Sequence, residues 1–204
     1  TDKDLILHGQ NHFQLFCDYE KKGIHGSVNI KYSGKKDILL DGKKIIKHSE
    51  LLGKLQTVLF GSNDIFIISG SPNERRVFFD IFLSILDYDY LVALRTYGLL
   101  LKQKNATLKN KRNDILCFFD KQIADVAFVL MAKRAALVQK VSLLFSELFK
   151  KIGLFKDEAI LKYNSSYNKF FSSSSELLDY ILYQDKYDIE KGYCLQGPHK
   201  DNYY

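Results

Sequence analysis

The sequence predicts an α+β fold in which an antiparallel sheet is followed by a mainly helical region and a return to strand. Alternating apolar residues between Gly26 and Tyr32 indicate a half-buried strand, and Asp41-Gly42 is a hairpin-turn signal. From Ser71 onwards, apolar residues recur at the three- and four-residue spacing of helices. Because 46% of the 204 residues are hydrophobic, the chain has enough apolar side chains for a core.

The strand-rich part is expected over residues 5–46 as an antiparallel meander, with turns at residues 21–23 and 41–42. A short helix is expected over about 49–55. The β-branched and apolar run 57–60 then predicts a strand that is buried on both faces.

The clearest helix start lies at Ser71. Ser71 is a good N-cap, Pro72 occupies the first helical position, and Glu74 completes a capping box. The helix body is apolar over more than half its circumference, which predicts burial between neighbouring elements. The residues expected to be buried are Val77, Phe78, Ile81, Phe82, Ile85 and Leu86.

Two longer helices are expected next, over about 89–108 and 114–152, with a polar turn between them. Gly153 is a plausible stop for the second. That helix carries an apolar stripe, which predicts the seam of a helix hairpin. The stripe consists of Phe119, Ile123, Val126, Leu130, Leu137, Val141, Leu144, Leu148 and Ile152.

The last part is expected to return to the sheet. Residues 159–163 resemble a strand, and Ser173 with Glu176 predicts the capped start of a final helix that ends near Asp185. The apolar run 193–195 predicts a closing strand.

Composition excludes several classes of protein. The formal charge is +6, from 30 basic and 24 acidic residues, which fits either a DNA-facing surface or merely a Lys-rich chain. Cys17, Cys117 and Cys194 lie too far apart for a zinc knuckle or a disulfide framework, so a reducing cytoplasm is expected. We expect no metal site, no catalytic residue, and no membrane span or signal peptide.

Several segments carry a family resemblance. Residues 197–202 read Gly-Pro-His-Lys-Asp-Asn, and residues 70–80 read Gly-Ser-Pro-Asn-Glu-Arg-Arg-Val-Phe-Phe-Asp. Further landmarks in the same order are Asp41-Gly42-Lys43, Leu59-Phe60, Asp64, Leu101-Lys102-Gln103-Lys104-Asn105, Arg134 and Gly192. Together they resemble the bacterial RecF recombination mediator, an ABC-type ATPase of the SMC-like group, over nearly the whole chain.

The resemblance implies three parts: residues 1–70 as the strand-rich part of the ATPase lobe, 71–187 as an inserted helical lid with a helix hairpin, and 188–204 as a return strand into the lobe. The phosphate-binding pattern Gly-x-x-x-x-Gly-Lys-Ser/Thr does not occur in the sequence. The resemblance therefore implies an internal segment that lacks the Walker A, signature and Walker B motifs. The family is a weak DNA-dependent ATPase, and this chain is not expected to hydrolyse ATP alone.

Two groups of residues are candidates for the nucleotide site. One is Asn63 with Asp64, where ABC-type ATPases sense Mg and the last phosphate. The family usually reads Ser-Pro-Glu-Asp there, so the neutral Asn63 cannot act as a base. A plain turn is the alternative. The other group is Gly197, Pro198, His199, Lys200 and Asp201, which approaches the composite ATP site in the family; a surface loop is the alternative.

DNA-binding candidates are Arg75, Arg76, Lys102, Lys104 and Arg134. Arginines in the first turn of a helix oppose its dipole, which suggests a partner such as phosphate; the alternative is an ion pair with Asp80. The lysines lie near the hairpin tip, where the alternative is a solvated turn. Arg134 aligns with an arginine that is common in the family.

The resemblance implies an ATP-dependent DNA-binding protein of recombinational repair and replication-gap repair, active in the SOS response. Its implied partners are double-stranded DNA or single-strand/double-strand junctions, RecR- and RecO-type proteins that help load recombinase, and a second copy in an ATP-dependent homodimer. Its implied cofactors are ATP and Mg, neither of which is expected to bind tightly to this chain alone. The alternatives are a non-catalytic protein-interaction module derived from such an ATPase and another SMC-like repair ATPase. The second would usually carry long coiled coils.

Overall fold

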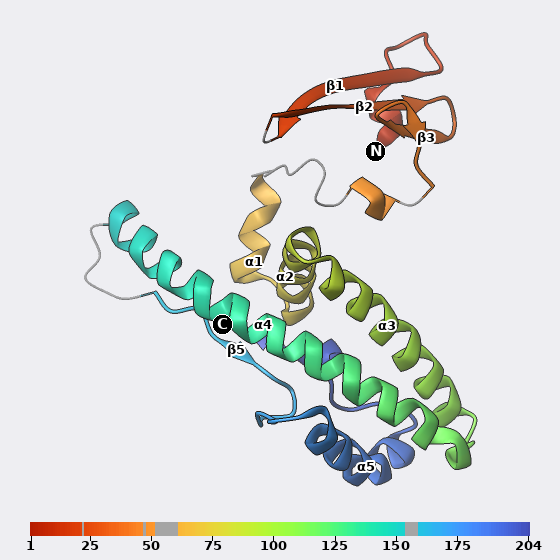
Figure 1. Ribbon diagram of the computed structural model, residues 1–204, viewed down its shortest axis with the longest axis vertical. Helices are drawn as coiled ribbons and strands as arrows, with labels where there is room; N and C mark the ends of the chain where they lie inside the picture. The colour runs from red at the N-terminus through yellow and green to blue at the C-terminus, as the bar shows by residue number, and fades with distance from the viewer. Residues whose placement is uncertain (22, 47, 52–60, 154–158) are drawn as a thin grey trace. The chain divides into compact units, whose positions relative to one another are not determined.

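The computed structural model describes residues 1–21, 23–46, 48–51, 61–153 and 159–204 (Figure 1). The chain divides into two compact units, Thr1–Leu59 and Phe60–Tyr204, called here the N-terminal unit and the helical unit. Each is described by itself. Antiparallel strands in the first and helices in the second confirm the predicted α+β class.

The N-terminal unit is a four-stranded antiparallel meander. Its strands are β1 (Phe13–Lys21), β2 (Ile24–Tyr32), β3 (Lys36–Leu40) and β4 (Lys43–Lys44), paired in that order. Short 3-10 turns are η1 (Asp2–Leu5) and η2 (His48–Leu51).

The β3–β4 turn confirms the hairpin signal at residues 41–42. Asp41 has φ +50° and Gly42 has φ +76°, as a type I′ turn requires. Val28 and Ile38 are the buried apolar residues of this sheet. The predicted helix over 49–55 falls partly, and the strand over 57–60 wholly, outside the described residues.

The helical unit begins with η3 (Ser62–Ile65), α1 (Phe66–Ser69) and α2 (Pro72–Leu86). The predicted capping box is confirmed. Ser71 Oγ accepts a hydrogen bond from the Glu74 amide (3.4 Å), and the Glu74 carboxylate accepts one from the Ser71 amide (2.6 Å). Among the described residues, no helix is both long enough and apolar enough to cross a membrane.

The expected buried face of α2 is wrong. Val77, Phe78, Ile81, Phe82 and Leu86 are 40–58% exposed, and the buried residues are Phe79, Leu83 and Ser84. Because the helix is apolar over more than half its circumference, its sequence pattern alone does not determine which part of that surface is buried. Contacts with α3 and the last strand make that choice.

A helix hairpin follows, formed by α3 (Tyr88–Lys109), η4 (Asn113–Ile115) and α4 (Leu116–Ile152), which lie side by side in Figure 1. The α4 stripe is confirmed at Ile123, Leu130 and Leu137, which are buried. It fails at its end, where Leu144, Leu148 and Ile152 are exposed. Lys133 of α4 pairs with Asp87, the residue just before α3. The part of α4 that follows Lys133 therefore extends beyond the start of α3.

The final segments also differ from expectation. α5 (Ser174–Lys191) runs past Asp185 and ends at Gly192, whose φ of +78° is the left-handed conformation that terminates helices. Residues 193–195 form no strand. The amides of Cys194 and Leu195 instead donate to Asn105 Oδ1 (2.8 Å) and Asp188 Oδ1 (2.9 Å).

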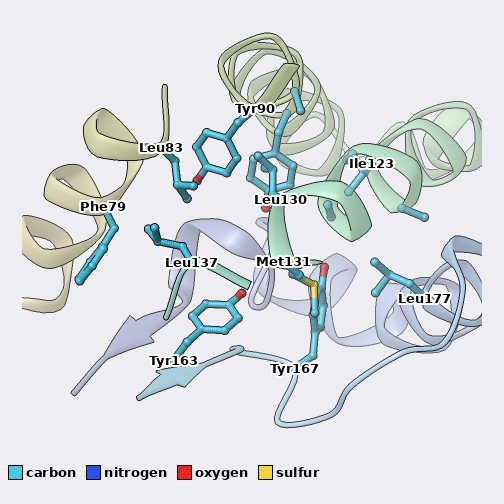
Figure 2. Close-up of a cluster of buried hydrophobic side chains, with 14 of the residues drawn as sticks. Phe79, Leu83, Tyr90, Ile123, Leu130, Met131, Leu137, Tyr163, Tyr167 and Leu177 are labelled. Atoms are coloured by element: carbon cyan, nitrogen blue, oxygen red, sulfur yellow. The ribbon is translucent and has the colours of Figure 1, made fainter. Parts of the chain in front are cut away.

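The closing strand is two residues long and lies at Asn202–Tyr203, after the predicted position at residues 193–195. β5 (Tyr163–Asn164) pairs with β6 (Asn202–Tyr203), after the 3-10 turn η5 (Pro198–Lys200). Figure 2 shows how residues from these elements and the helices form one core. The Tyr203 ring stacks on Phe79 of α2 with 4.1 Å between centroids, so the strand at the end of the described chain is fixed to the first long helix.

Candidate functional site

Arg134 lies at the centre of a buried polar network where α2, α3, α4 and the segment 197–203 meet. Its side chain is 1% exposed. The guanidinium donates to both oxygens of Asp80 (2.8 and 3.1 Å), to Asp201 Oδ2 (2.8 Å), to the Pro198 carbonyl (2.7 Å) and to the Tyr90 hydroxyl (3.0 Å). All of these groups belong to the protein, so Arg134 does not lie on a surface where DNA would contact it.

Asp201 is the fully buried acidic partner of that network. Besides Arg134, its carboxylate accepts hydrogen bonds from the Tyr163 hydroxyl and from the Ser166 amide (2.8 Å). Burial raises the pKa of Tyr163, which keeps the phenol protonated as a donor. The carboxylate is therefore held by the protein and is not free to bind a ligand.

Arg75 and Arg76 fasten the same segment from the first turn of α2. Arg75 donates to Asn202 Oδ1 (3.2 Å) and to the Gly70 carbonyl (2.8 Å), and Arg76 donates to the Asp201 carbonyl (2.7 Å). The expected alternative, an ion pair of one of them with Asp80, is replaced by the Arg134–Asp80 pair. Backbone carbonyls thus satisfy these cations at the positive end of the helix.

His199 packs against α3. Its Nδ1 lies 2.6 Å from the Tyr97 hydroxyl, and its Nε2 lies 3.3 Å from the Cys194 carbonyl. Burial lowers the pKa of His199 to about 4. Gly197 has φ +141°, and a Cβ there would lie 2.4 Å from the Tyr97 hydroxyl, so a side chain would displace this contact.

The pKa of His199 predicts a pH dependence of stability. The unfolded imidazole binds a proton near pH 6.5 and the folded one near pH 4, so the unfolded state holds more protons between these values. We expect the free energy of unfolding to fall by about 1–3 kcal/mol as the pH decreases through this window. Urea denaturation of the native chain and of His199→Gln at several pH values measures the difference; equal pH slopes would contradict the prediction.

Lys104 is a correction to the expected DNA-binding residues. Its side chain is 2% exposed, and its ammonium lies 2.7 Å from Asp120 Oδ1, 2.6 Å from Asp185 Oδ1 and 3.8 Å from Asp188 Oδ2. Burial raises the pKa of Asp120 to about 6 in spite of this pairing, and it raises the pKa of Asp188. Lys104 therefore joins α3 to α4 and α5 from within the unit and does not face solvent.

The side chains of the remaining candidates make no hydrogen bond to Arg134 in the described part of the structure. Lys102 and Lys200 are exposed. The carboxylate of Asp64 accepts a hydrogen bond from the Gly61 amide (2.6 Å), as in the plain-turn alternative. The Asn63 side chain falls outside the described part of the structure.

Several residues of the Arg134 network, the His199 contact and the Lys104 cluster are not evident from the sequence. Tyr90, Tyr97 and Tyr163 read as ordinary core aromatics, and no local pattern links Asp120 to Lys104. Their partners lie far along the chain: Arg134 is 44 residues from Tyr90, and Tyr163 is 38 residues from Asp201. In the sequence, only the family landmarks indicate that Arg134 and residues 197–202 are special.

Comparison with known proteins identifies the family. The chain is 32% identical over 207 aligned residues to the DNA replication and repair protein RecF of Clostridium botulinum, a match that covers 99% of the chain. It is also 32% identical over 191 residues to the RecF of Treponema pallidum, which covers 94% of the chain. This chain is a RecF homologue. No protein-family model matches it.

Solved RecF structures share its fold. The recombination mediator protein RecF-ATPrS in the RecFOR pathway superposes with a TM-score of 0.85 and 21% identity over the whole chain. RecF-ATP in the same pathway gives a TM-score of 0.83 at 22% identity over 98% of the chain. The chain spans 57% of the length of the C. botulinum RecF and 58% of the RecF-ATPrS chain. It therefore matches part of the RecF fold.

Proposed function

We propose that this chain acts as part of a RecF-type, ATP-dependent DNA-binding protein in recombinational and replication-gap repair. The observation that carries the proposal is the sequence match to proteins named DNA replication and repair protein RecF, which extends over 99% of the chain. The fold agrees with it, at a TM-score of 0.85. In this role the protein binds duplex DNA or single-strand/double-strand junctions, dimerises with ATP, and cooperates with RecO- and RecR-type partners.

Fewer of the candidate nucleotide-site residues have side chains available to a ligand than the sequence suggests. Within residues 197–201, Gly197, Pro198 and Asp201 are buried, and Lys200 is exposed. Asp64 and Asp201 use their carboxylates for contacts within the chain. We propose that Lys200 is the residue of this segment that approaches the nucleotide, and that the Arg134 network positions it.

A chimera tests the function. The matching part of the C. botulinum RecF is replaced by this chain and expressed in a bacterial strain that lacks its own RecF. We expect the chimera to restore survival after ultraviolet irradiation and to bind gapped DNA more tightly with ATP than without it. A folded chimera that does neither would favour the protein-interaction module instead.

Two point variants sharpen the test. Lys200→Ala in the chimera is expected to reduce the effect of ATP on DNA binding without changing thermal stability. Lys140→Ala, which changes another exposed lysine on α4, serves as the matched control. Equal behaviour of the two variants would remove Lys200 from the nucleotide site while leaving the RecF role in place.

A further inference from the structure

The outward face of α5 carries two exposed tyrosines. Tyr183 and Tyr187 are 58% and 40% exposed, and their four-residue spacing places both rings on one side of the helix. The ring centroids lie 6.3 Å apart at an interplanar angle of 68°. Lys186 Nζ lies 4.1 Å from the Tyr183 centroid and 4.8 Å from the Tyr187 centroid. A cation is thus held over both rings at the surface.

A surface hollow of about 480 Å³ lies beside these rings. Gln184, Leu195 and Gln196 contribute to its wall. The Tyr180 hydroxyl donates to Gln196 Oε1 (3.1 Å), which fixes the carboxamide and directs its NH₂ group away from Tyr180. The hollow therefore combines flat aromatic surface with side-chain amides that donate and accept hydrogen bonds.

The helix that carries this surface is held rigidly. Leu177 and Ile181, on the opposite face of α5, are buried in the core, and α5 packs on α4 (Figure 1). Gly192 ends the helix, and the Asp188–Leu195 hydrogen bond fixes the segment that follows. A rigid surface loses little conformational entropy when it binds a ligand.

The charges around the hollow are of both signs. Glu190 and Lys191 both line it and lie 3.8 Å apart, so their charges offset each other. Lys186 adds a positive charge beside the rings, and the exposed Asp179 adds a negative one a turn before Tyr183. The Lys186 ammonium is the cation that this surface offers to a phosphate.

We propose that Tyr183, Lys186, Tyr187 and the adjoining hollow bind an unpaired base of single-stranded DNA, an inference that rests on the proposed RecF-type function. One base stacks on an exposed tyrosine, its polar edge meets Gln184 or Gln196, and Lys186 lies near the backbone phosphate. Duplex DNA does not fit this role because its bases are stacked within the helix. At a single-strand/double-strand junction, this surface contacts the unpaired strand.

Fluorescence anisotropy with a short labelled oligothymidylate tests the proposal on the full chain. We expect Tyr183→Ala and Tyr187→Ala each to weaken binding by about tenfold, and Tyr183→Phe to retain it because the ring still stacks. Glu190→Gln is expected to strengthen binding by removing a negative charge. Tyr88→Ala, which removes a 67% exposed tyrosine on α3, is the matched control.

The outcomes separate this inference from the proposed function. A native chain that does not bind oligothymidylate, or alanine variants that bind it as the native chain does, would overturn the inference. Tighter binding of oligouridylate than of oligothymidylate would overturn the assignment to DNA. A third outcome is a chimera that fails to restore ultraviolet survival while the tyrosine variants still lose oligothymidylate binding. This outcome would support the single-strand-binding surface and contradict the RecF-type function.

Discussion

Replacing Arg134 with methionine is expected to lower the free energy of unfolding by about 3–5 kcal/mol. The guanidinium is the shared partner of Asp80 and Asp201, and its removal leaves two carboxylates without their cation inside the helical unit. Removing one partner of a buried ion pair costs much more than exchanging the whole pair for apolar groups, because a charge stays behind without compensation. Urea denaturation followed by circular dichroism measures the loss.

Controls isolate the effect of the Arg134 network. Arg95→Met changes an exposed arginine on α3 and is expected to alter stability by no more than about 0.5 kcal/mol. Adding Asp80→Asn and Asp201→Asn to the Arg134→Met chain removes the uncompensated charges and is expected to recover part of the loss. A loss below about 1 kcal/mol for Arg134→Met alone would show that water reaches these carboxylates.

Replacing Lys104 with methionine is expected to cost a similar amount, about 3–5 kcal/mol at neutral pH. Three carboxylates, those of Asp120, Asp185 and Asp188, surround this one ammonium. Without the cation their charges repel one another in a buried place. Thermal and urea denaturation of the variant, beside the exposed control Lys102→Met, measure the difference.

The Lys104 variant also has a distinct pH signature. Loss of the ammonium raises the pKa of Asp120 above its native value of about 6, so the folded state of the variant takes up protons more readily than the unfolded chain. The stability of Lys104→Met is therefore expected to rise as the pH falls from 7 towards 5. Asp120→Asn in the same chain is expected to remove this rise, and a Lys104→Met chain with a flat pH profile would contradict the explanation.

The sequence predicted the features that depend on local chemistry. The cap at Ser71 and the turn at residues 41–42 were found because each depends on side chains and backbone angles within a few residues. The prediction of a strand over residues 193–195 is wrong because a short apolar run is compatible with several structures. Their amides bind Asn105 and Asp188, which lie on two helices and which no pattern near residue 193 reveals.

Sequence patterns do not predict which charged side chains are buried. Lys102 and Lys104 look alike in the sequence, yet one is exposed and the other is surrounded by three carboxylates from α4 and α5. Similarly, the sequence suggested a phosphate or Asp80 as the partner of Arg75 and Arg76, but carbonyls and an amide side chain from the helical unit bind them. Only tertiary contacts across many residues distinguish these cases.

The hydrogen bonds from α2 to residues 201 and 202 have a consequence for biosynthesis. They join partners that are 125 and 127 residues apart. The arginines of α2 can therefore form these hydrogen bonds only after most of the helical unit has been translated. Closing so long a loop is entropically costly and slow compared with forming the α3–α4 hairpin. During synthesis the nascent α2 is therefore expected to expose its apolar side chains before these contacts form, and exposed apolar surface of this kind is what chaperones bind.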